Sequence, residues 1–319
     1  MHPTQPSFGT HTVKQFCLAL TVALILAAAA TVSSTAPQTN PLPEHVRIQT
    51  GDRNPWTNLQ FNDRRENFQF VIVTDRTGGR RPGVFSRAVD QINLMQPEFV
   101  LSVGDLIEGY TEDPGQWALE WSEFETVVDR LEMPFFFCAG NHDISNIPMN
   151  DDWNRRFRRS YYHFLYHDCL FLVLNSEDPP KTGPFHFSQP QRDWAVKTLK
   201  ENRDVRWTFV ITHKPTWTYP QTDLAKQGWT QIEDALSGRQ YTVFSGHKHA
   251  YARFIRRGQE YYMLATTGGS STLTGQQDGR FDHFVWVTMT AKGPVLANLM
   301  LDGVQHKTVR TLADPSADK

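Results

Sequence analysis

Short apolar runs recur along the chain from residue 68 onward and alternate with segments of helical periodicity. The runs are rich in Val, Ile, Phe and Tyr and have the length of buried strands. They cover residues 68–74, 98–103, 134–139, 169–175, 206–212, 241–245, 261–266 and 284–290. Between the first three runs, apolar side chains recur at helical spacing, which predicts two helices that each bury one face and hence β-α-β units. The two stripes consist of Phe85, Val89 and Ile92, and of Trp117, Trp121, Phe124, Val128 and Leu131.

Further along the chain, capping residues and a short turn predict additional elements. Ser188 is expected to cap the N-terminus of a third helix. Thr230 and Glu233 have the spacing of a capping box at the start of a fourth. Residues 161–166 and 169–175 are separated by two residues and predict a β-hairpin. Together these elements predict a layered α/β sandwich that contains both parallel and hairpin strands.

The first 36 residues differ in composition from the rest of the chain. Lys14 precedes an apolar run over residues 16–32 that is rich in Ala and Leu. This arrangement is typical of an export signal, with Ser34 and Ala36 at small-x-small positions and Ala28-x-Ala30 as a competing cleavage site. An uncleaved membrane anchor is the alternative, because the run approaches the roughly 20 residues that cross a bilayer. We therefore expect an exported protein, periplasmic or extracellular, whose mature chain has no membrane span unless this segment is retained.

The remaining chain is expected to form one large domain. Residues 37–67 carry Pro, Asn, Gln and charges without periodicity, and they predict a linker followed by an irregular lead-in. Trp56 and Phe61 are candidate anchors within this lead-in. The domain itself is expected over residues 68–310, and residues 311–319 are expected to be a C-terminal tail.

Composition and charge exclude several classes of function. With 39% hydrophobic and 12% aromatic residues, the chain of 319 residues is too apolar for disorder. Lys and Arg number 32 against 34 Asp and Glu, so no strong basic field exists to hold nucleic acid or an anionic membrane. Cys17 lies in the N-terminal segment, while Cys138 and Cys169 lie in apolar runs. The pattern predicts buried free thiols and excludes a disulfide framework or a Cys-x-x-Cys zinc site.

Five of the apolar runs end abruptly in residues that can bind a metal ion. The endings are Val73-Thr74-Asp75-Arg76-Thr77-Gly78-Gly79, Gly104-Asp105-Leu106-Ile107-Glu108, Gly140-Asn141-His142-Asp143, Ile211-Thr212-His213-Lys214-Pro215 and Gly246-His247-Lys248-His249. Because ligands of open α/β sheets bind just past the carboxyl ends of the strands, these loops are expected to meet in one crevice. Oxygen and imidazole ligands together suit manganese, iron, zinc or cobalt better than calcium. The sequence therefore predicts a metal centre.

The order of these motifs resembles that of the calcineurin-like metallophosphoesterases over about residues 68–250, and the pairing of Gly-Asn-His-Asp with Gly-His-x-His is specific. The resemblance implies an αββα-type sandwich of mixed β-sheets flanked by helices, with two divalent metal ions at the carboxyl ends of the strands. It implies that Asp105 bridges both ions, that Asn141, His213 and His247 complete the second site, and that Asp75 and His249 serve the first.

The resemblance also implies a reaction. His142 would face the substrate as the general acid, or as a stabiliser of transition-state charge, and Asp143 would orient its ring. A hydroxide that bridges the metal ions would be the nucleophile, because two divalent ions neutralise the anionic ester and lower the pKa of bound water. The expected activity is hydrolysis of a phosphomonoester or phosphodiester without a covalent intermediate.

The chain departs from the family pattern at Thr77, where most members have the histidine of an Asp-x-His motif. Purple acid phosphatases of the same superfamily also lack that histidine and supply a tyrosine from a Gly-Asp-x-x-Tyr motif, a position that Glu108 takes here. We expect Glu108 to fill the gap and to bias the first site toward manganese or iron over zinc. Tyr110 is a weaker substitute. The missing histidine also motivates an alternative, a non-catalytic metal-dependent binding protein of the same fold.

Arginines beside Gly78-Gly79 are candidate substrate contacts. Arg76 and Arg80 lie just past the first predicted ligand, so they either hold a phosphate by bidentate contacts or belong to a solvated turn. The expected partner is a small-molecule phosphoester such as a phospholipid headgroup diester, a nucleotide or a phosphorylated metabolite. The balanced charge indicates no specific nucleic-acid partner.

Overall fold

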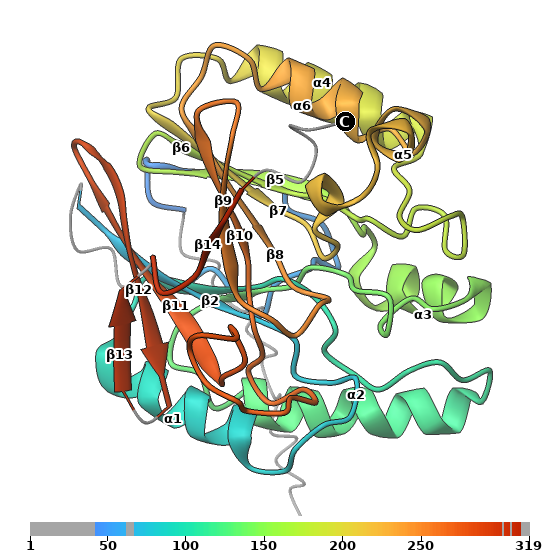
Figure 1. Cartoon of the computed structure of the whole chain (residues 1–319). Helices are drawn as coiled ribbons and strands as arrows, with labels where there is room; N and C mark the ends of the chain where they lie inside the picture. Colours follow the sequence, from blue (N-terminus) through green and yellow to red (C-terminus); the bar gives the residue numbers. More distant parts are fainter. Residues whose placement is uncertain (1–41, 62–66, 302, 307, 314–319) are drawn as a thin grey trace, which may run out of the picture. The chain divides into compact units, whose positions relative to one another are not determined.

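The computed structural model describes residues 42–61, 67–301, 303–306 and 308–313. Within these residues, two mixed β-sheets pack face to face and helices cover the outer face of each sheet (Figure 1). The predicted export signal and the first residues of the predicted linker lie outside the described residues. In the part of the chain that is described, no helix is both long and apolar enough to span a bilayer.

One sheet has eight strands, and its centre is parallel. The parallel strands β6, β7, β8 and β10 follow one another in this sheet, and antiparallel strands lie on both sides of them. In spatial order the strands are β1 (Val46–Ile48), β5 (Tyr162–Tyr166), β6 (Cys169–Val173), β7 (Trp207–Ile211), β8 (Tyr241–Ser245), β10 (Gln259–Met263), β9 (Ala252–Arg256) and β14 (Thr311–Leu312).

The other sheet has six strands and combines a parallel half with an antiparallel half. Strands β2, β3 and β4 are parallel, whereas β11, β12 and β13 form an antiparallel meander that joins them through β2. In spatial order the strands are β13 (Gly303–His306), β12 (Gly293–Met300), β11 (His283–Thr290), β2 (Gln69–Val73), β3 (Phe99–Ser102) and β4 (Phe135–Phe136).

Helices cover the two outer faces of this sandwich. The six-stranded sheet packs against α1 (Val84–Met95), α2 (Pro114–Val128) and α3 (Ile147–Phe157). The eight-stranded sheet packs against α4 (Gln189–Glu201), α5 (Gln221–Lys226), α6 (Trp229–Ala235) and the 3-10 helix η1 (Thr216–Thr218). Figure 1 shows α1 and α2 on one side of the sheets and α4 and α6 on the other. This is the αββα-type architecture that the resemblance implies.

Aromatic side chains fill the space between the two sheets. Along β2, Phe70 and Ile72 belong to the core between the sheets, while Val71 and Val73 belong to the core beneath the helices. This alternation follows from the two-residue repeat of a strand. The Phe99 ring lies 5.3 Å from that of Phe171 on the opposite sheet. Complete burial of one phenylalanine side chain stabilises the folded state by about 1.5–3 kcal/mol. The aromatic layer therefore holds the two sheets together and fixes the strand ends that position the site.

Most predicted elements are present. Each of the eight apolar runs overlaps a strand, both helical stripes form helices, residues 161–175 form the β5–β6 hairpin, and Ser188 caps α4 by accepting a hydrogen bond from the Gln191 amide. The predicted capping box is wrong. Helix α6 begins directly after Gly228, whose φ is 93°, and Glu233 instead forms a buried ion pair with Arg256 at 2.6 Å.

The segments on either side of residues 68–310 contribute strands to the eight-stranded sheet. Strand β1 comes from the predicted lead-in and pairs with β5, while β14 comes from the predicted tail and pairs with β9. In the lead-in, Trp56 is buried and Phe61 packs against the core between the sheets.

Candidate metal centre

The five metal-capable loops follow the carboxyl ends of β2, β3, β4, β7 and β8. The first three strands are parallel neighbours in one sheet, and the last two are parallel neighbours in the other. Their loops therefore emerge at the same edge of each sheet, and side-chain contacts join them across the sandwich. One of these contacts links Asn141 after β4 to His213 after β7 at 2.9 Å.

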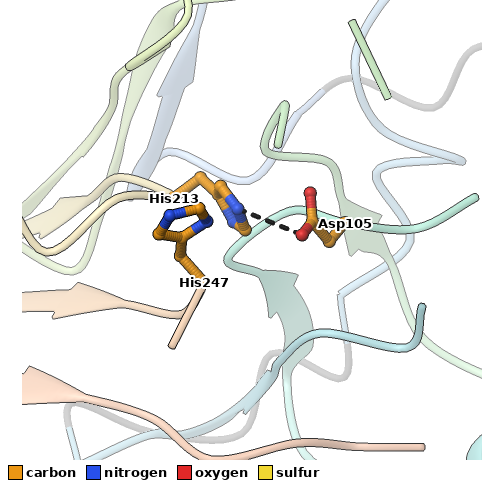
Figure 2. A group of neighbouring side chains, drawn as sticks. All are labelled: Asp105, His213 and His247. Carbon is orange, nitrogen blue, oxygen red and sulfur yellow. Dashed lines mark ion pairs between the residues drawn. The ribbon is translucent and has the colours of Figure 1, made fainter. Parts of the chain in front are cut away.

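Among the residues that the structure describes, two overlapping groups of side chains have the geometry to hold a metal ion. One consists of Asp105, His213 and His247, and the other of Asp75, Asp105 and His249. In each group the possible ligand atoms all lie within 4.8 Å of one another. Figure 2 shows the first group, with the Asp105 carboxylate directed at the His213 ring and the His247 ring beside it. Asp105 belongs to both groups, so its carboxylate lies between two candidate metal positions.

Hydrogen bonds to the backbone orient the imidazole rings. Nδ1 of His213 lies 2.9 Å from the carbonyl oxygen of Val103, which leaves Nε2 facing Asp105 Oδ2 at 3.2 Å. Nδ1 of His249 lies 2.7 Å from the carbonyl oxygen of Ser270, and its Nε2 lies 3.4 Å from Asp75 Oδ1. Such partners are typical of metal-binding imidazoles, because a hydrogen bond at one nitrogen leaves the lone pair of the other free for the ion.

Two motif glycines allow the backbone to approach the carboxylates closely. A Cβ atom on Gly140 would overlap Oδ1 of Asp105, and a Cβ atom on Gly246 would overlap Oδ2 of Asp75. The Asp75 carboxylate also accepts a hydrogen bond from the His247 amide at 2.7 Å. Glycine therefore precedes Asn141 and His247 because no larger residue leaves room for the two carboxylates.

The donor set fits divalent cations. Asp75 and Asp105 are almost completely buried, and buried carboxylates are costly unless positive charge lies beside them. Two carboxylates, three imidazoles and the Asn141 amide are ligands that manganese, iron, zinc and cobalt accept. Seven of the predicted site residues thus meet here, namely Asp75, Asp105, Asn141, His142, His213, His247 and His249.

His142 lies at the edge of this cluster. Its Nε2 is 4.0 Å from Asp105 Oδ2, and its Nδ1 is 2.6 Å from the carbonyl oxygen of Glu108. Its side chain is 20% exposed, whereas Asp105 is buried. Because the Glu108 carbonyl group holds Nδ1, the Nε2 atom of this partly exposed ring lies on the side of the cluster.

The predicted role of Asp143 in orienting the His142 ring is wrong. The Asp143 carboxylate accepts hydrogen bonds from four backbone amides, those of Asp105, Leu106, Ile107 and Gly140, at 2.8–3.1 Å. Burial and the nearby Asp105 carboxylate raise the pKa of Asp143 to about 7. Asp143 therefore shapes the loop that carries Asp105, and the Glu108 carbonyl orients the His142 ring.

Among the predicted carboxylate and imidazole ligands, Glu108 alone belongs to neither group of side chains. Its carboxylate accepts hydrogen bonds from the amides of Arg80 at 2.7 Å and Gly79 at 3.2 Å. Burial alone would raise the pKa of Glu108, but the nearby Thr77 hydroxyl and the hydrogen bonds from these two amides outweigh burial and lower it. Glu108 thus ties the loop after β2 to the loop after β3.

The two arginines predicted to contact substrate have other partners. The buried Arg76 guanidinium donates to the Leu106 carbonyl oxygen at 2.7 Å and lies 5.4 Å from the centre of the Phe124 ring. Arg80 forms an ion pair with Glu123, which also contacts Arg76. These contacts hold Arg76 within the helical layer, and its predicted contact with substrate remains a prediction.

The sequence reasoning did not identify the backbone groups that orient the histidines. The carbonyl oxygens of Val103, Glu108 and Ser270 hold His213, His142 and His249. Every residue has a carbonyl group, so no residue type marks these positions. The two remaining cysteines, Cys138 and Cys169, are buried free thiols as predicted.

This fold and this site define a metal-dependent phosphoesterase. Residues 68–251 match the family described as calcineurin-like phosphoesterases, and the chain belongs to that family. The chain is 30% identical over 246 residues to the serine/threonine-protein phosphatase CPPED1 of Pongo abelii, an alignment that covers 70% of this chain and 74% of that protein.

Two further proteins extend the comparison. Purple acid phosphatase 21 of Arabidopsis thaliana is 26% identical over 188 residues, which cover 53% of this chain and 41% of that protein. Among solved structures, a dimetal phosphatase from Danio rerio has a TM-score of 0.57 at 14% identity, and the match covers 75% of this chain and 98% of that one. The similarity to that structure establishes the fold alone.

Proposed function

We propose that this protein hydrolyses a phosphoester at a dinuclear centre, with His142 as the general acid. The main support for this proposal is that the Asp105 carboxylate belongs to both groups of candidate ligands. Two divalent ions bound in this way neutralise the ester, lower the pKa of a water molecule and align its attack with the leaving oxygen. The protein contributes the positions of the ligands and of the proton donor.

Each side chain has a defined task in this proposal. Asp75 and His249 hold the first ion, and Asn141, His213 and His247 hold the second. His142 is anchored through Nδ1 to the Glu108 carbonyl oxygen, so its Nε2 supplies the proton to the departing oxygen. Imidazole suits this task near neutral pH.

The two metal positions are unequal. The first position has two carboxylates and one imidazole. Glu108 does not add a third carboxylate, because its oxygens accept hydrogen bonds from backbone amides. The second has one carboxylate, two imidazoles and the Asn141 amide nearby. We therefore propose that the second position binds its ion more tightly, and that the carboxylates of the first favour manganese or iron over zinc.

The names of the relatives guide the choice of substrates. A serine/threonine-protein phosphatase and purple acid phosphatases are among the similar proteins, which supports phosphomonoesters, including phosphoserine peptides, as the first candidates. The pair p-nitrophenyl phosphate and bis(p-nitrophenyl) phosphate separates monoesterase from diesterase activity, because both release the same chromophore.

The test is metal-dependent turnover by the purified protein. Metal-free protein is reconstituted in turn with manganese, iron, zinc and cobalt, and initial rates are measured on both esters. Asp105→Asn is the control, because it preserves size but removes the shared charge. Turnover that requires metal and is lost in this variant supports the enzyme. Tight binding of one ion without turnover on either ester or on phosphoserine peptides would favour the non-catalytic binding protein.

We also propose that the protein is exported. The supporting observation is the apolar run over residues 16–32, which follows Lys14 and precedes Ser34 and Ala36. Cell fractionation and N-terminal sequencing test this proposal. A protein recovered inside the cell with its first residues intact contradicts it.

A further inference from the structure

Tyr110 presents an aromatic surface beside the proposed general acid. Its ring centroid lies 4.7 Å from that of His142, and the two rings meet edge to face at 80°. Tyr110 is 62% exposed, whereas the neighbouring candidate ligands Asp105 and His213 are buried. A large exposed aromatic ring therefore borders the place where His142 would meet a substrate.

The Tyr110 hydroxyl also contacts a candidate metal ligand. The Asn141 Nδ2 atom donates a hydrogen bond to the phenolic oxygen at 3.0 Å, while Asn141 Oδ1 lies 2.9 Å from His213 Nε2. An amide has two donors on its nitrogen and its acceptor on its oxygen, and cations bind the oxygen. By accepting from the nitrogen, Tyr110 turns the amide so that its oxygen faces the ligand group.

The backbone holds Tyr110 in this place. Its φ of 51° lies in the left-handed region, which a residue other than glycine keeps only when its surroundings fix it. Hydrogen bonds fix it here. The Tyr110 amide donates to Ser145 Oγ at 3.1 Å, and the Gly109 amide donates to Glu120 Oε2 at 2.8 Å. The exposed ring is thus a positioned feature of the site.

We propose that Tyr110 is a specificity and positioning residue of this site. Its ring packs against the leaving group and favours aryl or heteroaromatic phosphoesters over alkyl ones, and its hydroxyl positions the Asn141 amide toward the second metal ion. The inference rests on the proposed function, because His142 as general acid places the leaving group beside the Tyr110 ring. It is distinct from a tyrosine ligand, since the Tyr110 oxygen bonds to Asn141.

The first experiment tests the ring. The kcat/KM values are measured for wild type, Tyr110→Leu and Tyr110→Phe on an aryl phosphate and an alkyl phosphate with leaving groups of matched acidity. Tyr110→Leu is expected to lower the aryl-to-alkyl ratio about tenfold, mainly through KM, because aromatic packing is lost. Tyr110→Phe keeps the ring and is expected to keep the ratio. An equal loss on both esters in Tyr110→Leu would overturn the specificity role.

A matched control separates this effect from the loss of any surface tyrosine. Tyr161 is also partly exposed, and its ring lies 5.0 Å from that of Trp194, with which it lines a separate groove. Tyr161→Leu is expected to leave the aryl-to-alkyl ratio unchanged. A shift as large as that of Tyr110→Leu would count against a role specific to Tyr110.

The second experiment tests the hydroxyl without using activity. Competition with a chromophoric chelator measures the affinity of each ion in wild type, Tyr110→Phe and Tyr161→Phe. Loss of a group that orients a metal ligand weakens metal binding about 10–100-fold, so Tyr110→Phe is expected to weaken one ion selectively. Unchanged affinity for both ions would overturn the positioning role. If wild type hydrolyses neither these phosphate esters nor phosphoserine peptides with any metal, the proposed function fails, while the chelator titration still decides the contact with Asn141.

Discussion

The Nε2 atom of His213 lies 3.2 Å from Oδ2 of Asp105, and both side chains are buried. Burial alone would lower the pKa of His213, but the Asp105 carboxylate outweighs burial and raises it to about 9. Burial alone would raise the pKa of Asp105, and the charge of His213 likewise outweighs it and lowers that pKa. In the metal-free protein, an imidazolium at His213 therefore supplies the positive charge that a bound cation would otherwise bring.

This pair predicts that the metal-free protein loses stability at alkaline pH. The pKa of His213 is higher in the folded protein than its ordinary value of 6.5, so its contribution is complete below pH 6.5 and is lost as the pH rises through about 9. The Asp105 carboxyl has a lowered pKa and stays ionised throughout this range, so the loss of stability follows the proton of His213 alone. We expect the free energy of unfolding to fall on the order of 3 kcal/mol across this range.

Denaturant unfolding of the metal-free protein at several pH values measures this loss. Two controls isolate the pair. His213→Gln is expected to flatten the alkaline dependence, and loading with metal is expected to abolish it, since the ion replaces the proton. The same alkaline slope in His213→Gln would assign the loss to another group.

His142→Asn is expected to reduce kcat without removing metal. General acid catalysis contributes about 10²–10⁴-fold, and the loss depends on how much the leaving oxygen needs a proton. p-Nitrophenolate is a stable anion, so its ester should lose much less activity than phenyl phosphate. Steady-state kinetics on both esters, with metal analysis of the same samples, check this expectation.

His163→Asn is the matched control for His142, because His163 packs beside Trp194, with a ring separation of 5.7 Å, on the wall of the separate groove. It should leave both rates unchanged. An equal loss on the two esters in His142→Asn would argue that this residue stabilises transition-state charge and does not protonate the leaving group.

Glu108→Gln distinguishes a metal ligand from a loop contact. The structure places the Glu108 carboxylate on the amides of Gly79 and Arg80, so the variant should keep both ions and lose about 1–3 kcal/mol of stability. Metal analysis and thermal unfolding measure the two effects. Selective loss of one ion with unchanged stability would instead support the ligand role that the sequence predicts for Glu108.

The sequence predicted the ligands better than their surroundings. Asp75, Asp105 and His213 each lie two or three residues past the end of a strand, so the strand fixes where each side chain emerges, and the motif order could be read from the chain. The roles of Asp143 and Glu108 depend on loops that close on one another from different strands. The packing of these loops decides which backbone amides donate to each carboxylate. Neither the spacing of the motifs nor the residue types predict that packing.

Arg76→Met should destabilise the protein without changing substrate binding. Burial lowers the pKa of Arg76 to about 10, so the guanidinium remains charged at neutral pH, where it donates to the Leu106 carbonyl oxygen and lies against Phe124. Its removal leaves that carbonyl without the donor, at an expected cost of about 1–3 kcal/mol. Arg80→Met is the matched control, because Arg80 is 33% exposed and its pair with Glu123 should be worth at most about 1 kcal/mol. Chemical denaturation and KM measurements on both variants test this assignment. A raised KM with unchanged stability in Arg76→Met would instead support the predicted substrate contact. A side chain that only stabilises the fold would change the free energy of unfolding.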